Sequence, residues 1–382
     1  MTGTPRAFRI RGLVGWIVKL LVQPQDGIAP LLAAIKSAKK SIDILIFRMD
    51  WKDLETALKA ASGRGVAVRA LIAHTNRGGE PKLRNLEMRF LEAGITVSRT
   101  ADDWIRYHGK MMIVDSRTLF VLSFNFVHLD IEHSRGFGIV TTTAKLVQEA
   151  EKLFEADCNR QTYTPRVNTF VVSPANARKQ LSAFIQCAKK QLLIYDPKIA
   201  DRQIIRLLQD QAKAGLDIKI IGSIAAGNAN LAVSPLTSMR LHTRTIILDG
   251  QQAFVGSQSL RPPELDSRRE IGIIVRDSKV VNSLLATFEK DWESTGYDEI
   301  HDALKKDQET PPPPAAAAKA TRALVKEMKP LTTTVKQAIK KAVAQAGDAV
   351  PGRAEMKSTV KGAVKKAVKE AVKELVQEGQ GQ

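Results

Sequence analysis

Two stretches, His108-Gly-Lys-Met-Met-Ile-Val-Asp115 and His242-Thr-Arg-Thr-Ile-Ile-Leu-Asp249, decide the fold because they share one pattern. In each, a cation follows the histidine by two residues, and an aspartate follows the cation by five. The apolar run before each aspartate is typical of a buried strand. Two ordinary core histidines would not repeat the cation and the aspartate as well. The pattern therefore indicates an internal repeat.

The rest of the chain supports this repeat. With an offset of 150 residues, the segments beginning at Val22, Ala38 and Gly65 recur at Val172, Ala188 and Gly215. With an offset of 134 residues, His108, Asp115, Ser123 and Gly138 recur at His242, Asp249, Ser257 and Gly272. The second copy is thus 16 residues shorter between Gly215 and His242. The missing part corresponds to a helix that we predict over residues 81–93 of the first copy.

Each copy alternates predicted helices and strands, which favours parallel strand units in a sheet covered on both faces. The other predicted helices cover residues 28–38, 53–61, 143–157, 175–188, 201–214 and 278–292. The main predicted strands cover residues 20–22, 42–47, 66–72, 107–114, 192–195, 218–222 and 241–248. We therefore predict an α/β fold of two pseudo-twofold halves, each a mixed sheet flanked by helices. Its parts are an N-terminal segment 1–19, halves 20–160 and 161–300, and a tail 301–382.

The composition limits the class of protein. The 382 residues are 44% hydrophobic and 26% charged, which excludes global disorder. Cys158 and Cys187 form no metal or disulfide motif and are expected to stay reduced. No apolar run is long enough to span a membrane, although a surface-lying amphipathic segment could precede the strand predicted over residues 20–22. We expect a cytoplasmic protein, with peripheral membrane attachment left open.

A formal net charge of +18, spread over the halves and the tail, favours a polyanionic partner. That partner is an anionic membrane surface or nucleic acid, and the charge does not choose between them. The tail begins with a stiff spacer, Pro311–Pro314, followed by predicted Lys/Ala-rich helices with valines at every fourth position from Val360 to Val376. A solvated or self-associating helix, membrane binding and nucleic-acid binding all fit this stripe. The oligomeric state is left open.

Alternation along a strand predicts the site. Side chains two residues apart face the same way, so each histidine shares a face with its cation, Lys110 or Arg244. The polar side chains expected to face these groups from the next strand are Ser123, Asn125, Ser257 and Ser259. Joined about a pseudo-twofold, the halves would offer two imidazoles and two cations to one phosphodiester. Because no carboxylate cluster is needed, we expect no metal and no other cofactor.

The paired pattern resembles the phospholipase D superfamily over residues 20–297. The resemblance implies a two-histidine, metal-independent phosphodiesterase or phosphatidyltransferase with His108 as nucleophile and His242 as general acid and base. It also implies that Glu270, in Ser-Arg-Arg-Glu-Ile-Gly-Ile-Ile, orients one imidazole. Asp115 and Asp249 are the last residues of the two motifs and lie at predicted strand ends. The sequence does not decide whether they have a structural or a chemical role.

Several positions depart from the family pattern. Arg244 stands in place of the usual lysine, Leu122 in place of a glycine, and Ser259 in place of an asparagine. Gly136 occupies the position equivalent to Glu270, so the first half lacks its orienting acid, and Glu132 is a nearby substitute.

Three functions fit this sequence. The leading one is cleavage of a phospholipid phosphodiester through a phosphohistidine, since two motifs in one chain are typical of the lipid-acting relatives. The absence of a predicted transmembrane helix ahead of the first half argues against a cardiolipin synthase. A metal-independent nuclease of the same superfamily is the alternative, because the basic surface suits DNA equally well. The third is a catalytically weak protein that binds phosphate or another polyanion.

Overall fold

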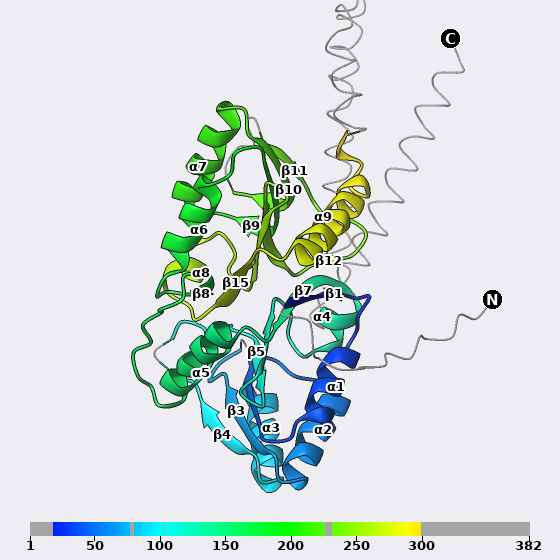
Figure 1. Ribbon diagram of the computed structural model, residues 1–382, viewed down its shortest axis with the longest axis vertical. Helices are drawn as coiled ribbons and strands as arrows, with labels where there is room; N and C mark the ends of the chain where they lie inside the picture. The colour runs from blue at the N-terminus through cyan, green and yellow to red at the C-terminus, as the bar shows by residue number, and fades with distance from the viewer. Residues whose placement is uncertain (1–17, 77–79, 103, 226–230, 299–382) are drawn as a thin grey trace, which may run out of the picture. The chain divides into compact units, whose positions relative to one another are not determined.

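The computed structural model describes residues 18–76, 80–102, 104–225 and 231–298 (Figure 1). The N-terminal segment before Val18 and the predicted tail helices lie outside these residues. No described helix has the length and apolar character needed to cross a membrane.

The first half opens with a short strand and ends with a long helix. In chain order it contains β1 (Val18–Gln23), α1 (Ala29–Ser37), β2 (Ser41–Ile46), α2 (Lys52–Gly63), β3 (Ala67–Ile72), α3 (Glu80–Glu92), β4 (Thr96–Arg99), β5 (Met111–Val114), β6 (Thr118–Leu122), α4 (His128–Glu132), β7 (Ser134–Thr141) and α5 (Ala144–Cys158).

The second half repeats this plan. It contains β8 (Phe170–Val172), α6 (Ala177–Gln186), β9 (Gln191–Ile199), α7 (Arg202–Lys213), β10 (Asp217–Ile224), β11 (Ala232–Ser234), β12 (Arg240–Leu241), β13 (Arg244–Leu248), β14 (Gln252–Gly256), α8 (Pro262–Asp266), β15 (Ile271–Val275) and α9 (Ser278–Glu293). Only seven residues separate β10 from β11, against 23 between β3 and β4, so this connection is too short for a counterpart of the 13-residue α3.

Strand order confirms the predicted α/β fold of two mixed sheets. The first sheet runs β1-β7-β6-β5-β2-β3-β4, and the second runs β8-β15-β14-β13-β9-β10-β11 in the matching sense. In both sheets, the last three strands in this order are parallel to one another: β2, β3 and β4 in the first, and β9, β10 and β11 in the second. All other neighbours in this order pair antiparallel. The short strand β12 leaves its own half and pairs with β7 of the first.

Apolar residues fill three cores. Alternation sends Met111 and Ile113 of β5 into a central core, and Met112 and Val114 into the outer core of the first half. The central core also contains side chains from α5, α9 and the second sheet, so it joins the two halves. In Figure 1, α1, α2 and α3 cover the lower sheet and α6, α7 and α8 the upper one. The halves therefore pack as one unit through a shared apolar layer.

The predicted strands around both histidines were too long. The strand expected over residues 107–114 begins only at Met111, and the one expected over 241–248 is interrupted between Leu241 and Arg244. Ser123 and Asn125 follow β6 instead of lying within it. The backbone around each histidine pairs with the other half, which removes it from its own sheet.

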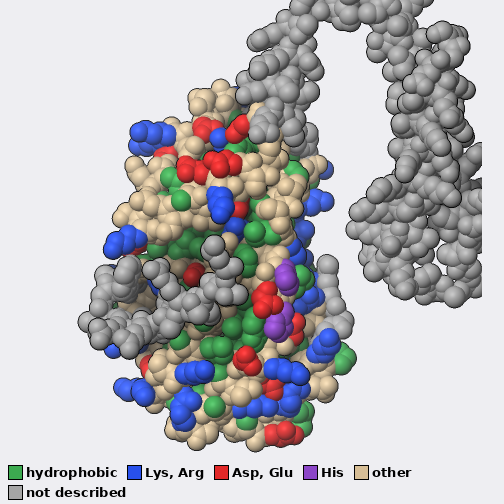
Figure 2. Space-filling view, turned by 90° about the vertical axis from the view of Figure 1, so that its right-hand side faces the viewer, with side chains coloured by type: hydrophobic (Ala, Val, Ile, Leu, Met, Phe, Trp, Pro, Cys, Tyr) green, Lys and Arg blue, Asp and Glu red, His purple; other side chains and the backbone are tan. Residues whose placement is uncertain are grey.

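Charge is distributed over the face shown in Figure 2 without forming a patch of one sign. Lys and Arg side chains lie on both halves, with Asp and Glu side chains between them. On this face the basic excess therefore does not mark a single binding surface.

Candidate active site

The two motif histidines lie where the halves meet. The His108 backbone N–H donates to the Arg269 carbonyl at 2.7 Å, and the His242 N–H donates to the Arg135 carbonyl at 3.1 Å. Because Arg135 and Arg269 occupy equivalent repeat positions, the two contacts are related by the pseudo-twofold. Each histidine is therefore held by the opposite half.

Each histidine is also contacted by its own cation. The Lys110 ammonium donates to the His108 carbonyl at 2.6 Å, and Arg244 Nη1 donates to the His242 carbonyl at 2.5 Å. The Lys110 side chain is fully buried, and burial, opposed by the charge of Glu270, lowers its pKa to about 7. Both predicted histidine–cation pairs are thus brought together, although neither lies on a regular strand.

The charges of the two halves act on one another. Burial, followed by the charges of Lys110 and Arg244, lowers the pKa of His108 well below its usual value. Burial and Arg244 also lower the pKa of His242, with Lys110 contributing from the other half. The two histidines and two cations therefore form one electrostatic cluster in which burial and the cations favour the neutral imidazoles.

Glu270 contacts His108 as the resemblance implied. Its Oε2 lies 2.8 Å from His108 Nδ1, and its side chain is fully buried. A carboxylate on Nδ1 fixes the ring and favours the tautomer that leaves a lone pair on Nε2. Burial raises the pKa of Glu270, while the charge of Lys110 opposes this shift.

His242 has no equivalent partner on Nδ1, which is buried without a hydrogen bond in the described structure. The equivalent position is Gly136, where a Cβ would meet the Phe124 ring at 3.1 Å. A larger side chain there would require the Phe124 ring to shift by a few tenths of an ångström, so the packing around Gly136 disfavours an acid.

The suggestion that Glu132 substitutes for the missing acid was wrong. Glu132 lies on the exposed face of α4, 3.2 Å from His128. Asp130, on the buried face of the same short helix, has its Oδ2 3.4 Å from His242 Nε2. Its carboxylate also accepts from Arg240 at 2.7 Å, so a charged acid still faces His242 from the first half.

The four predicted phosphate-binding side chains are engaged within the site. Asn125 Nδ2 donates to Asp130 at 2.7 Å, which positions that carboxylate. Its counterpart Ser259 accepts from Arg244 Nε at 3.2 Å and donates to the buried Asp196 at 2.9 Å. The hydroxyls of Ser123 and Ser257 accept from backbone N–H groups of the neighbouring strands, at 2.9 and 3.1 Å. Asn125 and Ser259 thus position an acid and a cation beside the histidines, whereas Ser123 and Ser257 connect neighbouring strands.

Asp115 and Asp249, which end the two motifs, accept hydrogen bonds from backbone N–H groups. Asp115 accepts hydrogen bonds from the N–H groups of Lys39, Lys40 and Ser41 at the start of β2. Asp249 makes the equivalent bonds to residues 189–191 at the start of β9. Each lies at the far end of its strand, five residues along the chain from the cation, which is about 16 Å in an extended chain. These hydrogen bonds hold the turn that connects α1 to β2 in the first half and the turn that connects α6 to β9 in the second.

Three further side chains of the site were missed by sequence reasoning. Asp130 and Asp196 are isolated acids whose importance depends on the partners that the fold brings to them. Phe47 packs edge-on against His108, with ring centroids 4.7 Å apart, and lies under the Lys110 ammonium. Asp196 directly follows an apolar strand run, which was the one available signal.

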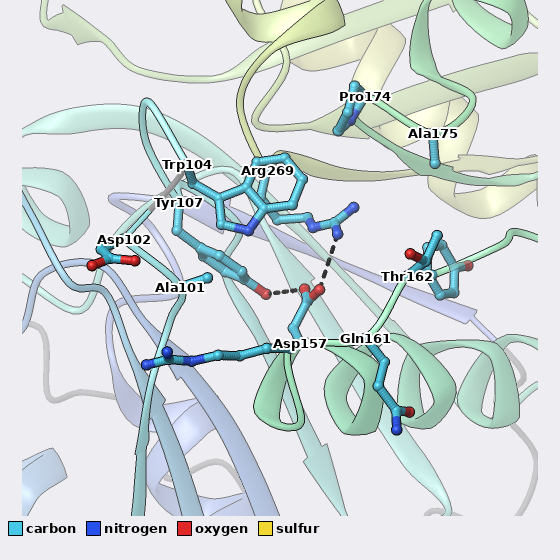
Figure 3. A pocket seen from close by; sticks show the side chains of 12 residues that line it. Ala101, Asp102, Trp104, Tyr107, Asp157, Gln161, Thr162, Pro174, Ala175 and Arg269 are labelled. Carbon is cyan, nitrogen blue, oxygen red and sulfur yellow. Dashed lines mark hydrogen bonds and ion pairs between the residues drawn. The ribbon is translucent and has the colours of Figure 1, made fainter.

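A cavity of about 490 Å³ lies beside this cluster, and its lining includes Trp104, Tyr107, Asp157 and Arg269 (Figure 3). None of the four motif histidines and cations lines it. Among the described residues, no group of three or more His, Cys, Asp or Glu is placed to hold a metal ion.

Comparison with known proteins identifies the family. A family model described as cardiolipin synthase, PLD-like domain, matches residues 31–158 and 181–292. The chain belongs to the phospholipase D superfamily. Cardiolipin synthase 1 of Bacillus cereus is 23% identical in an alignment of 337 positions that covers 72% of this chain and 66% of that synthase. The chain thus spans just under two thirds of this superfamily relative.

Solved structures share the fold of this superfamily member. Polyphosphate kinase from Porphyromonas gingivalis superimposes with a TM-score of 0.61 and 19% identity, covering 72% of this chain and 50% of the kinase. Phosphatidylserine synthase from Haemophilus influenzae superimposes with a TM-score of 0.55 and 11% identity, covering 73% of this chain and 86% of the synthase.

Proposed function

We propose that this chain transfers the phosphatidyl group of a phospholipid to water or to an alcohol, through a covalent intermediate on His108. The observation that carries the proposal is the buried contact between Glu270 and His108 Nδ1. This contact leaves Nε2 as the nucleophilic nitrogen, beside two cations. Membership of the superfamily and the similarity to a cardiolipin synthase support a phospholipid substrate.

In the first step, His108 Nε2 attacks phosphorus and forms the N–P bond. The bond from phosphorus to the headgroup oxygen breaks, and His242 gives its proton to that oxygen. A bound phosphodiester brings negative charge between Lys110 and Arg244, which opposes the lowering of the His242 pKa and allows that ring to carry the proton. The two cations stabilise the charge on the equatorial phosphoryl oxygens.

In the second step, neutral His242 removes a proton from water or an alcohol. The resulting oxygen attacks phosphorus, the N–P bond breaks, and His108 is released. Hydrolysis gives phosphatidic acid, while an alcohol acceptor gives a new phosphatidyl ester. Every proton is returned to its starting position, and the proposed cycle needs no metal ion.

The test presents purified full-length protein with vesicles of phosphatidylcholine and headgroup-labelled phosphatidylglycerol, with EDTA present. Single- and double-stranded DNA are assayed in parallel, and His108→Asn serves as the inactive control. We expect release or transfer of the labelled headgroup by the natural sequence only. Cleavage of DNA without lipid turnover would replace the proposal with a nuclease, and turnover that requires a divalent ion would contradict the mechanism.

A further inference from the structure

Two buried arginines occupy equivalent positions in the repeat, directly before Gly136 and Glu270. Each pairs with an aspartate on the last helix of the opposite half. Arg135 binds Asp291 of α9 through two hydrogen bonds, at 2.6 and 2.8 Å. Arg269 binds Asp157 of α5 at 3.0 Å. The two ion pairs therefore cross between the halves in opposite directions.

The similarity extends to the other partners of these pairs. Tyr195 donates to Asp291 at 2.8 Å, and Tyr107 donates to Asp157 at 2.7 Å, the contact drawn in Figure 3. We name Arg135, Asp291 and Tyr195 the first clasp, and Arg269, Asp157 and Tyr107 the second clasp. In both, Nη1 of the arginine donates to a carbonyl at the end of an edge strand, that of Gln23 at 2.8 Å or Ser173 at 3.2 Å.

The arginine of each clasp accepts a hydrogen bond from one of the two histidines through its backbone carbonyl. The carbonyl of Arg269 accepts the N–H of His108, and the carbonyl of Arg135 accepts the N–H of His242. The residue after Arg269 is Glu270, which also holds the His108 ring, whereas the residue after Arg135 is a glycine. The second clasp therefore fixes both backbone and ring of its histidine, and the first clasp fixes the backbone alone.

Stability alone does not account for the clasps. Replacing a buried ion pair with apolar groups of similar volume is often neutral or stabilising, because desolvation offsets the attraction. Here two such pairs recur at equivalent positions, and in each a tyrosine donates to the aspartate while a backbone carbonyl accepts from the arginine. Geometry, more than added stability, is what this arrangement supplies.

We propose that Arg135 and Arg269 are positioning residues, and that each clasp sets the place of one catalytic histidine from the opposite half. The proposal rests on the proposed function, because it assigns the second clasp to the nucleophile and the first clasp to the general acid. Loss of the second clasp then slows attack on every substrate. Loss of the first clasp slows only reactions whose leaving group needs a proton.

The test compares Arg269→Lys with Arg135→Lys, since lysine keeps the charge and loses the planar fork. Two substrates share the phosphatidyl group: phosphatidylcholine, whose leaving group needs protonation, and phosphatidyl-p-nitrophenol, whose leaving group does not. We expect Arg269→Lys to reduce kcat on phosphatidylcholine and the p-nitrophenol burst rate about tenfold each, with KM unchanged. We expect Arg135→Lys to reduce only the phosphatidylcholine rate, leaving the burst within about twofold. Equal losses on both substrates in both variants would overturn the proposal.

A milder matched pair covers the case in which the lysine variants do not fold. Tyr107→Phe and Tyr195→Phe each remove one hydrogen bond to a clasp carboxylate, and they should divide the two substrates in the same way. Nitrogen-15 spectra of histidine-labelled protein supply a readout without turnover. The imidazole signals of His108 should change in Tyr107→Phe, and those of His242 should change in Tyr195→Phe. Each variant should leave the signals of the other histidine unchanged.

These readouts separate the two proposals. If the natural sequence turns over neither lipid, the proposed function fails, and the imidazole signals still decide the role of the clasps. If turnover is present and neither tyrosine variant changes its own histidine signal, the clasps are only structural and this inference is wrong.

Discussion

The two halves have the same strand order but treat their histidines differently. In the second half, Glu270 reaches across and binds His108 Nδ1. In the first half the equivalent residue is Gly136, and the space beside it holds the Phe124 ring. The short helices differ as well, because Asp130 of α4 faces His242, whereas its counterpart Glu264 of α8 binds Arg268 and Arg261.

This difference fits the division of roles that we propose for the two histidines. A nucleophile benefits from a fixed ring and one defined tautomer, both of which Glu270 supplies to His108. A general acid must gain and lose a proton, and an acid 3.4 Å away restricts His242 less. A repeat with a symmetric backbone has thus acquired two unequal histidines through a few side chains.

The largest expected effect separates the two histidines directly. His108→Asn should reduce turnover to background for every phosphodiester, because no covalent intermediate can form. His242→Asn should cost about 10²–10⁴ in rate on phosphatidylcholine, yet retain a p-nitrophenol burst on the activated ester. Steady-state and burst rates measure this, and equal loss on both substrates in both variants would remove the distinction between the histidines.

Weakening the contact between Glu270 and His108 should have the next largest effect. Glu270→Gln keeps the shape but no longer favours the proton on His108 Nδ1, so kcat should fall about a hundredfold with little change in KM. Glu132→Gln is the matched control, because that exposed acid contacts only His128 among the described residues, and it should leave kcat unchanged. Similar rates for the two variants would argue that Glu270 does not orient the nucleophile.

The difference between the halves can also be reduced by giving the first half the side chains of the second. Gln258 and Glu270 are the counterparts of Phe124 and Gly136, so Phe124→Gln with Gly136→Glu should supply an acid to His242 Nδ1. A charged partner should raise the pKa of His242 and increase the phosphatidylcholine rate about tenfold. Gly136→Glu alone should be less stable than the double variant, because the new side chain meets the Phe124 ring. An unchanged His242 titration in the double variant would show that the pseudo-twofold does not extend to these side chains.

The smallest expected effect concerns anion binding at the buried cations. Since the pKa of Lys110 is about 7, its ammonium is charged below that pH and neutral above it. Sulfate stays a dianion over this range, so its affinity should fall about tenfold between pH 6 and 8. Lys110→Arg keeps its charge and should remove most of this dependence. Isothermal titration with sulfate measures both, and a pH-independent affinity in the natural sequence would contradict the burial of Lys110.

Much of this site could be predicted from the repeat. The paired histidines and their cations were found because chance does not repeat that spacing at equivalent positions. Strand alternation, however, was the wrong reason for expecting His108 and Lys110 to act together. Both precede β5, and Lys110 reaches His108 through a hydrogen bond to its carbonyl. The short-range pattern identified the residues, and contacts between the halves decided their geometry.

The missed residues have a common cause. Asp130 and Glu132 are two residues apart in the sequence, and which of them faces His242 depends on how α4 packs. Arg135 and Arg269 were visible as charges, but their partners lie on helices more than a hundred residues away. Contacts of that separation follow from tertiary structure and leave no local pattern in one sequence.

The most direct test of the central claim is mass spectrometry of rapidly quenched enzyme. His242→Asn is mixed with phosphatidyl-p-nitrophenol, which needs no general acid for the first step and leaves no base for the second. We expect a phosphatidyl adduct that accumulates on His108 and is absent when His108 is also replaced. An adduct on His242 in the reciprocal His108→Asn variant, with none on His108, would contradict it.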